Sequence, residues 1–171
     1  MVQLKKFVKA DYEQLICWID SAETLMQFAG PAFVFPLTAK QLNKSLEDIN
    51  RSAFKVVDSH THHTIGHAEL YLTDATAYLG RILIGDKAQR GKGIGQQIVH
   101  LLLSHTFSTT NKTRIELNVF DWNTDAIRCY EKAGFVIETG NTHERKINGQ
   151  TWIALNMTIE KQKWKMRKNN I

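Results

Sequence analysis

The middle of the chain alternates apolar and polar residues with a period of two, which is the pattern of half-buried β-strands. Three such runs follow one another: FKVV from Phe54, IGHAELYL from Ile65 and AYLGRILI from Ala77. Residues with turn propensity separate the runs at positions 59–64 and 73–76. We therefore predict three consecutive strands, for which an antiparallel meander is the simplest arrangement.

Helical spacing takes over after the third run. A helix is predicted from about 93 to 107, and its core-facing stripe, spaced i, i+4, i+7 and i+8, consists of Ile94, Ile98, Leu101 and Leu102. The later elements predicted are a strand over 114–120, a helix over 124–133 closed by Gly134, and final strands over 135–138 and 152–159.

The N-terminal region is predicted to be mainly helical. After a short strand over 2–8, helices are expected from Asp11, over 21–28 and, with Thr38 as the N-cap, over 39–49. Antiparallel strands followed by crossovers through helices predict an α/β fold. We expect a single domain with a mixed, mostly antiparallel sheet and helices on both faces.

The composition agrees with a globular α/β domain and argues against several other classes of protein. The 171 residues are 43% hydrophobic and 23% charged, as in an ordinary globular domain. No apolar run reaches the ~18 residues of a membrane-spanning helix, and the opening MVQLKKFVKA lacks the apolar stretch of a secretory signal. Cys17 and Cys129 are too far apart to suggest a metal-binding or disulfide pattern. We expect a cytoplasmic protein that does not interact with membranes.

The positive charge is concentrated at one end of the chain. The formal net charge is +5, and residues 161–171 hold five Lys and Arg and no Asp or Glu, so the remainder is neutral. A nucleic-acid-binding domain normally carries a basic face on its folded part. We therefore expect a domain over 1–160, a solvated basic tail over 161–171 and no nucleic-acid partner. Contact of the tail with an acidic partner is the alternative.

The sharpest motif is a glycine-rich turn between the third strand and the next helix, ILIGDKAQRGKGIG over 82–95. Glycines let the backbone approach a ligand, and a helix N-terminus presents N–H groups with partial positive charge, so this turn can cradle phosphate. Two known phosphate-binding motifs do not fit this turn. The mononucleotide loop would need Gly91 one residue closer to Gly85, and the dinucleotide fingerprint would need a glycine in place of Gln96. The pattern that remains is R-x-x-G-x-G at Arg90, Gly93 and Gly95.

This pattern resembles the acetyl-CoA signature of the GCN5-related N-acetyltransferase family, Q/R-x-x-G-x-G/A at a strand-to-helix turn. A second block, N-x-x-A-I-x-x-Y-E-K-x-G-F from Asn123 to Phe135, matches the same family. The two blocks occur in the family's order, and the positions that match the family are concentrated over 77–138. The resemblance implies the acyl-CoA N-acyltransferase fold, acetyl-CoA as co-substrate, no metal, and direct transfer of acetyl to an amine.

For the co-substrate, the resemblance implies three kinds of contact. The backbone of 91–96 would hold the pyrophosphate, and the main chain of 83–85 would pair with the pantetheine arm in a gap between two splayed strands. An N–H group near 83–85 would polarise the thioester carbonyl. Asn123 would bond the arm, although capping the following helix is its alternative role. The residues implied to bind acetyl-CoA are Leu83, Ile84, Gly85, Arg90, Gly91, Lys92, Gly93, Ile94, Gly95, Gln96 and Asn123.

Catalysis requires one proton to be delivered and another to be removed. The resemblance implies that Tyr130 protonates the departing coenzyme A thiolate, since a phenol keeps its proton at neutral pH; packing in the core is its alternative role. Asn118 stands where some relatives carry a glutamate base, and an amide cannot accept the proton. Glu116 and Glu69 are the candidate bases, and a chain of water molecules is equally acceptable.

The histidines are not expected to bind metal. His60, His62 and His63, with His67 beyond them, lie at a predicted turn without a set of cysteine or carboxylate ligands. We expect them to be solvated.

The function expected from the resemblance is acetyl-CoA-dependent N-acetyltransfer to a primary amine, either a small molecule or a protein N-terminal α-amine. The order of elements and the N-terminal helices resemble the branch that acetylates ribosomal-protein α-amines. The alternative is a non-catalytic acyl-CoA-binding or regulatory module with the same fold. A homodimer is a further expectation, because dimers are common among relatives.

Overall fold

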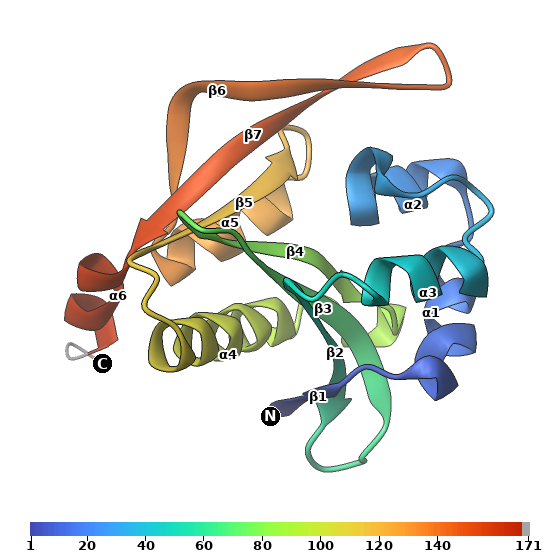
Figure 1. The fold of residues 1–171 in the computed structure, drawn as a ribbon, viewed down its shortest axis with the longest axis horizontal. Helices are drawn as coiled ribbons and strands as arrows, with labels where there is room; N and C mark the ends of the chain where they lie inside the picture. The colour runs from blue at the N-terminus through green and yellow to red at the C-terminus, as the bar shows by residue number, and fades with distance from the viewer. Residues whose placement is uncertain (169–171) are drawn as a thin grey trace.

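A seven-stranded sheet runs through residues 1–168, the part of the chain that the computed structural model describes (Figure 1). The strand order is β1-β2-β3-β4-β5-β7-β6, and neighbouring strands are antiparallel except for β4 and β5, which are parallel. The predicted meander is confirmed as β2, β3 and β4. The strands are β1 (Val2–Lys6), β2 (Arg51–Asp58), β3 (Thr64–Leu72), β4 (Ala77–Ile84), β5 (Arg114–Phe120), β6 (Val136–Ile147) and β7 (Gln150–Glu160).

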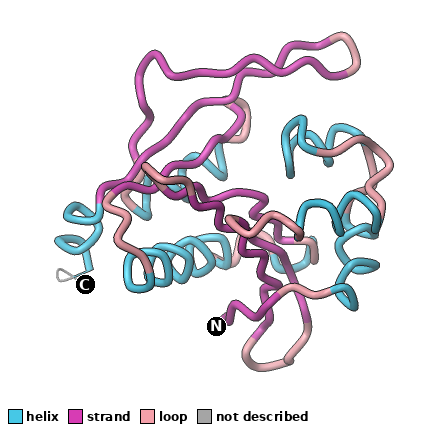
Figure 2. Tube along the Cα trace, viewed as in Figure 1, coloured by secondary structure: helices cyan, strands magenta, loops and turns pink. Residues whose placement is uncertain are grey.

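Helices cover both faces of this sheet (Figures 1 and 2), which confirms the predicted mixed α/β fold. The first three helices pack on one face, and α4 and α5 pack on the other. Among residues 1–168, no helix has the length and apolar character needed to cross a membrane. The α-helices are α1 (Tyr12–Trp18), α2 (Ala22–Ala29), α3 (Ala39–Leu46), α4 (Ile94–Thr109), α5 (Thr124–Ala133) and α6 (Lys161–Lys168).

Local sequence signals fix where several helices begin and end. The Ser21 hydroxyl accepts a hydrogen bond from the Thr24 N–H at 3.1 Å, which caps α2. Thr38 caps α3 in the same way, as predicted. Gly134 ends α5 in the left-handed conformation, with φ of 109°. These ends were predictable because each depends on residues within one turn of the helix.

The buried stripe of α4 differs in part from the predicted one. Ile94, Ile98 and Leu102 are buried as expected, but Leu101 is only half-buried. The stripe is wider than predicted because α4 packs against α5 as well as against the sheet. Its other buried residues are Val99, Leu103, Thr106 and Phe107.

The last two strands form a much longer hairpin than the predicted strands over 135–138 and 152–159. The hairpin closes at Asn148 and Gly149, whose φ angles of 47° and 77° are those of a tight turn with both central residues left-handed. An Asn-Gly pair favours this turn and was the available sequence signal. The hairpin extends above α2, where Asn148 donates a hydrogen bond to Glu23 (Figure 1).

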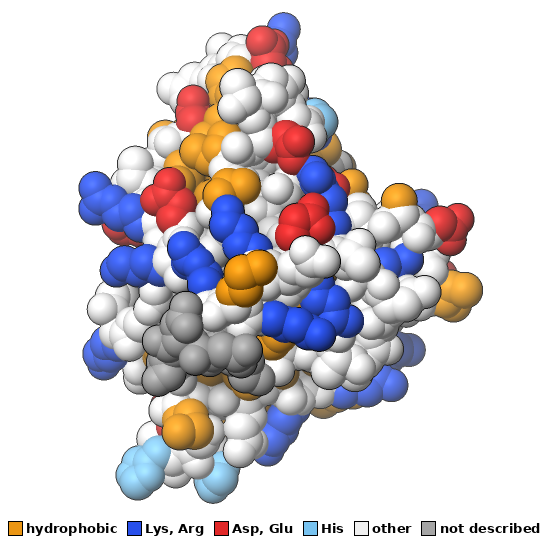
Figure 3. Space-filling view, turned by 90° about the vertical axis from the view of Figure 1, so that its left-hand side faces the viewer, with side chains coloured by type: hydrophobic (Ala, Val, Ile, Leu, Met, Phe, Trp, Pro, Cys, Tyr) orange, Lys and Arg blue, Asp and Glu red, His pale blue; other side chains and the backbone are white. Residues whose placement is uncertain are grey.

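The prediction of a solvated tail beginning at residue 161 is wrong for the described part of that segment. Lys161–Lys168 forms α6, and Trp164 is 7% exposed, with its ring 5.4 Å from the ring of Phe107. One large aromatic side chain thus holds the basic segment against the core. Lysines and arginines remain on the outer surface at this end of the molecule (Figure 3). Residues 169–171 lie outside the described chain.

Candidate active site

The sheet opens between β4 and β5. These strands pair at only two positions, the last of which joins Tyr78 to Glu116, whereas β3 stays paired with β4 as far as Ile84. A bulge in β4 follows the last pair, and Arg81 within it has φ of 49°. The edge of β4 beyond Tyr78 therefore faces an opening. This confirms the gap expected between the two strands.

A cavity of about 1170 Å³ occupies this opening. Its walls come from α2, β4, the glycine-rich turn, and the junction of β5 with α5. The lining includes Thr24 of α2 and Tyr130 of α5. Because α2 and α5 pack on opposite faces of the sheet, the cavity passes through the gap from one face to the other.

The glycine-rich turn forms one end of the cavity. Gly91 and Gly93 both have φ of 74°, in the left-handed region that glycine adopts without strain. A Cβ atom at either position would meet nothing within 4 Å, so the space in front of the turn is open. Gly93 is also the N-cap of α4 and has no side chain to bond the first N–H groups of that helix. The turn therefore fits a pyrophosphate group.

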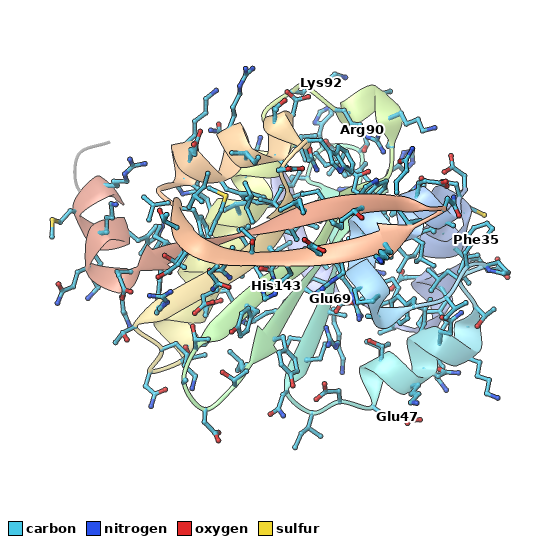
Figure 4. All side chains as sticks on the ribbon, turned by 90° about the horizontal axis from the view of Figure 1, so that it is seen from above. Phe35, Glu47, Glu69, Arg90, Lys92 and His143 are labelled. Carbon is cyan, nitrogen blue, oxygen red and sulfur yellow. The ribbon has the colours of Figure 1, made fainter. Side chains whose placement is uncertain are left out.

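Most of the predicted co-substrate residues lie around the cavity. Arg90 fixes the turn, because its Nε donates to the Ile84 carbonyl oxygen at 3.0 Å. Figure 4 shows Arg90 and Lys92 on one side of the β6–β7 hairpin and Glu69 on the other. The predicted co-substrate residues in the lining are Leu83, Ile84, Arg90, Gly91, Gly93, Gly95, Gln96 and Asn123.

Three predicted co-substrate residues do not line the cavity. Ile94 is 6% exposed and belongs to the hydrophobic core under α4. Gly85 is required by packing, because a Cβ there would lie 1.9 Å from the Trp18 ring. Lys92 is exposed at the tip of the turn. Its charge still adds to the positive potential at that end of the cavity.

Asn123 has a definite structural role. Its Oδ1 accepts a hydrogen bond from the Ala126 N–H at 3.3 Å, so it is the N-cap of α5. Asn123 also lines the cavity and is half-buried. Capping and contact with a ligand are compatible, since an amide carries both donors and acceptors.

Tyr130 lies in the cavity wall on the α5 side. It is half-buried, and its ring packs edge-to-face against Phe135 with 6.0 Å between ring centroids. Burial raises the pKa of Tyr130 well above its ordinary value, so the phenol is protonated at neutral pH. The side chain thus carries a proton at neutral pH and lines the cavity.

Glu69 belongs to a buried ion cluster on the α1–α3 side. Its carboxylate lies 2.7 Å from Arg51 Nη1, 3.0 Å from Arg81 Nη1 and 3.1 Å from His67 Nε2. Burial alone would raise the pKa of Glu69, but the hydrogen bond from His67 and the charges of Arg81 and Arg51 outweigh it and lower the pKa to about 2. Glu69 lines the cavity as a stable anion.

Unlike Glu69, Glu116 is not among the described residues that line the cavity. It accepts hydrogen bonds from Arg114 Nε at 3.0 Å and from Asn156 Nδ2 at 3.2 Å. Tyr78 lies between Glu116 and the cavity at the point where the strands separate. Burial first, and then the Glu116 charge, raise the pKa of Tyr78. Asn118, which cannot act as a base, faces the cavity.

Sequence reasoning missed Arg51 and Arg81. Both line the cavity, and both guanidiniums lie over aromatic rings, Arg51 over Tyr71 at 4.9 Å and Arg81 over Phe33 at 4.2 Å. The only local signal for Arg81 was its position inside the otherwise apolar run AYLGRILI, a run that does not include Arg51.

The expectation of solvated histidines holds only for the turn itself. His60, His62 and His63 are exposed, but His67 is 1% exposed and packs against the rings of Phe7 and Phe28. Within residues 1–168, no group of His, Cys, Asp and Glu side chains is arranged to hold a metal ion.

Comparison with known proteins identifies the class. The model of the acetyltransferase (GNAT) family matches residues 22–135. Spermidine N(1)-acetyltransferase of Vibrio cholerae serotype O1 is 29% identical over 141 residues, which are 80% of this chain and 79% of that protein. A probable N-acetyltransferase of Bacillus subtilis (strain 168), YjcK, is 40% identical over 74 residues, which are 43% of this chain and 40% of that protein.

Solved structures agree over nearly the whole length. The spermidine N-acetyltransferase from Vibrio cholerae in complex with CoA and spermine has a TM-score of 0.80 at 25% identity, covering 95% of this chain and 97% of that one. An aminoglycoside acetyltransferase in complex with coenzyme A shares the fold, with a TM-score of 0.77 at 22% identity, covering 98% and 99% of the two chains. The sequence matches to the first curated relatives are shorter, spanning 26% to 48% of their lengths.

The split sheet and the phosphate-binding turn are the architecture of an acyl-CoA N-acyltransferase. The chain belongs to the acetyltransferase (GNAT) family. This confirms the family and the fold predicted from the two sequence blocks, and the predicted enzyme class, an acetyl-CoA-dependent N-acetyltransferase, is the class that defines this family.

Proposed function

We propose that the protein transfers an acetyl group from acetyl-CoA to the nitrogen of a primary amine. One observation carries the proposal: a single cavity joins the phosphate-binding turn to the protonated Tyr130 and then crosses the sheet. Acetyl-CoA supplies an acetyl thioester that an uncharged amine can attack. The rival function, a non-catalytic acyl-CoA-binding module, gives no reason for a proton donor in the cavity wall.

The chain's own groups would hold the co-substrate and deliver a proton. The turn over 91–96 binds the pyrophosphate, and the open edge of β4 hydrogen-bonds the pantetheine arm through its main chain. As the N–C bond forms and the C–S bond breaks, the electron pair of the C–S bond passes to sulfur. Tyr130 then donates its proton to that sulfur, and the proton that the nitrogen loses on becoming an amide restores the phenol. A main-chain N–H of β4 stabilises the charge that develops on the carbonyl oxygen.

The acceptor ammonium must lose a proton before it attacks, because an alkylammonium has a pKa of about 10.4. Glu69 is a weak proton acceptor, since its pKa is about 2. We assign it a structural role as the partner of Arg51 and Arg81. Glu116 is the candidate base that is left, although it lies outside the cavity lining and would be reached through water and the neighbouring Tyr78.

Relatives named as spermidine and aminoglycoside acetyltransferases support a small-molecule acceptor. A protein α-amine, a homodimer and a cytoplasmic location stay predictions. The two cysteines, Cys17 and Cys129, are unpaired, which supports a reducing compartment.

The test replaces Tyr130 with phenylalanine, which keeps the ring and removes only the hydroxyl. We expect the affinity for acetyl-CoA to stay close to that of the parent and kcat to fall by about 10²-fold, at the low end for general acid catalysis because a thiolate is a tolerable leaving group. Coenzyme A release with an amine panel measures kcat, and calorimetry measures acetyl-CoA binding.

The matched control is Tyr12→Phe. The Tyr12 hydroxyl donates a hydrogen bond to Asn43 Oδ1 at 3.1 Å, and it lies in the smaller core and not in the cavity wall. This control variant should keep the parental kcat. An unchanged kcat in Tyr130→Phe, in an enzyme limited by chemistry, would remove Tyr130 from the mechanism.

A further inference from the structure

The cavity has a second half on the α1–α3 side of the sheet, away from the glycine-rich turn. Arg81 bonds Ser45 of α3 at 2.7 Å and lies over Phe33, and Glu69 is bonded by His67, which packs against Phe28 of α2. These contacts place the Glu69 cluster on the face opposite Tyr130. We call this part of the cavity, lined by Arg51, Glu69, Arg81 and Arg145, the acceptor half.

Positive charge exceeds negative charge in the acceptor half. The two guanidiniums of Arg51 and Arg81 share the single carboxylate of Glu69, which leaves one positive charge in excess. Asp48 offsets little of it, because it is 4.0 Å from Arg51 Nη2, partly solvated and outside the lining. Arg145 lines the cavity from β6, whose hairpin contacts α2 on this side of the sheet, and adds a second positive charge.

The other carboxylates in the lining do not reverse this balance. Asp20 lies 3.7 Å from Lys87, and both side chains are largely exposed at the rim of the cavity. Asp125 is in the first turn of α5, beside the half that faces the glycine-rich turn. Among the described residues, no lining carboxylate is therefore left to bind a second ammonium group in the acceptor half.

We infer that the acceptor is a primary amine that also carries an anionic group, a carboxylate or a phosphate, and not a polyamine. This inference rests on the proposed function and specifies its substrate class. The anion would lie against the guanidiniums while the amine points towards the gap between β4 and β5. A compound with several ammonium groups would place an unpaired cation beside Arg51 and Arg81, where repulsion is strong because little water screens it.

The arginines are suited to this role because they are already held in place. Arg81 is 9% exposed and Arg51 19% exposed, and each is stacked on an aromatic ring. Little side-chain entropy is lost when such a guanidinium binds a carboxylate or phosphate. The Arg145 guanidinium donates only to a backbone carbonyl oxygen, that of Glu144, among its described hydrogen bonds. Arg145 can therefore be mutated with less disturbance of the structure than Arg51 or Arg81.

The test uses acceptor pairs that differ by one anionic group. Phenylalanine is compared with 2-phenylethylamine for a carboxylate, O-phosphoethanolamine with ethanolamine for a phosphate, and spermidine serves as the polycation. Binding of each amine to the coenzyme A-saturated protein is measured by calorimetry, and thiol release from acetyl-CoA is measured in parallel. We expect the anionic member of at least one pair to bind at least about tenfold more tightly than its partner, and more tightly than spermidine.

Arg145→Gln should reduce that preference several-fold, whereas Lys146→Gln, the neighbouring residue outside the cavity lining, should leave it unchanged. Tighter binding of spermidine, or equal binding within both pairs, would overturn the inference. Thiol release reports separately on the proposed function. Failure of every amine to release thiol would reject acetyl transfer, while the binding preference would still decide the charge of the ligand.

Discussion

The Glu69 cluster allows a quantitative test of the structure. The carboxylate is 4% exposed and is bonded by Arg51, Arg81 and His67. Glu69→Gln keeps the shape of the side chain and removes its charge, so two guanidiniums would remain buried together without their anion. A buried ion pair broken in this way typically costs ~3–5 kcal/mol of folding free energy.

The pKa of Glu69 gives a second estimate of the same energy. It is about 2 in the folded protein against an ordinary value of 4.5. A difference of this size corresponds to ~3 kcal/mol of stability. Because the folded pKa is the lower one, this stability is complete above pH 4.5 and is lost as the pH falls towards 2. At pH 3.5 the contribution should have fallen to roughly 2 kcal/mol.

Urea denaturation of the parent and of Glu69→Gln at pH 7 and at pH 3.5 measures this directly. We expect the difference in unfolding free energy between the two proteins to be ~3 kcal/mol at pH 7 and to shrink by about 1 kcal/mol at pH 3.5. Glu47→Gln, at an exposed glutamate after α3 (Figure 4), is the control and should change stability by less than about 0.5 kcal/mol at either pH. A destabilisation by Glu69→Gln that is independent of pH would refute the assignment of the lowered pKa.

Two further predictions concern the turn and the C-terminal helix. Gly93→Val should weaken coenzyme A binding at least about tenfold in calorimetry, because the valine side chain would fill the open space before α4. The control is Gly140→Val, at a similar φ of 83° but away from the cavity; it should strain the backbone equally and leave the affinity for coenzyme A intact. Trp164→Ala should lower the unfolding free energy by ~3–5 kcal/mol in urea titrations, whereas Met166→Ala, on the same helix and 64% exposed, should change it by less than about 0.5 kcal/mol. Unchanged binding by Gly93→Val, or equal stability of the two α6 variants, would contradict these assignments.

Features that depend on residues close together in the sequence were predictable. The helix caps at Thr38 and Gly134 and the glycine-rich turn each depend on a few consecutive positions, so their sequence signals are local. The α6 helix was not predictable in this way. Its charge indicated a solvated tail, and the burial of Trp164 depends on Phe107, which is distant in the chain. Contacts between distant residues decided the structure there.

The sequence by itself determined the family, the meander, the phosphate-binding turn and the position of Tyr130 in the second block. The tertiary structure decided which of the two candidate carboxylates is held as a stable anion and what charge the acceptor half carries. Glu69 and Glu116 look alike in sequence, and only the pairing of β2, β3 and β4 brings Arg51 and Arg81 onto Glu69. The physical reason is that acidity and recognition depend on burial and on charges within a few ångströms, and those neighbours come from separate strands.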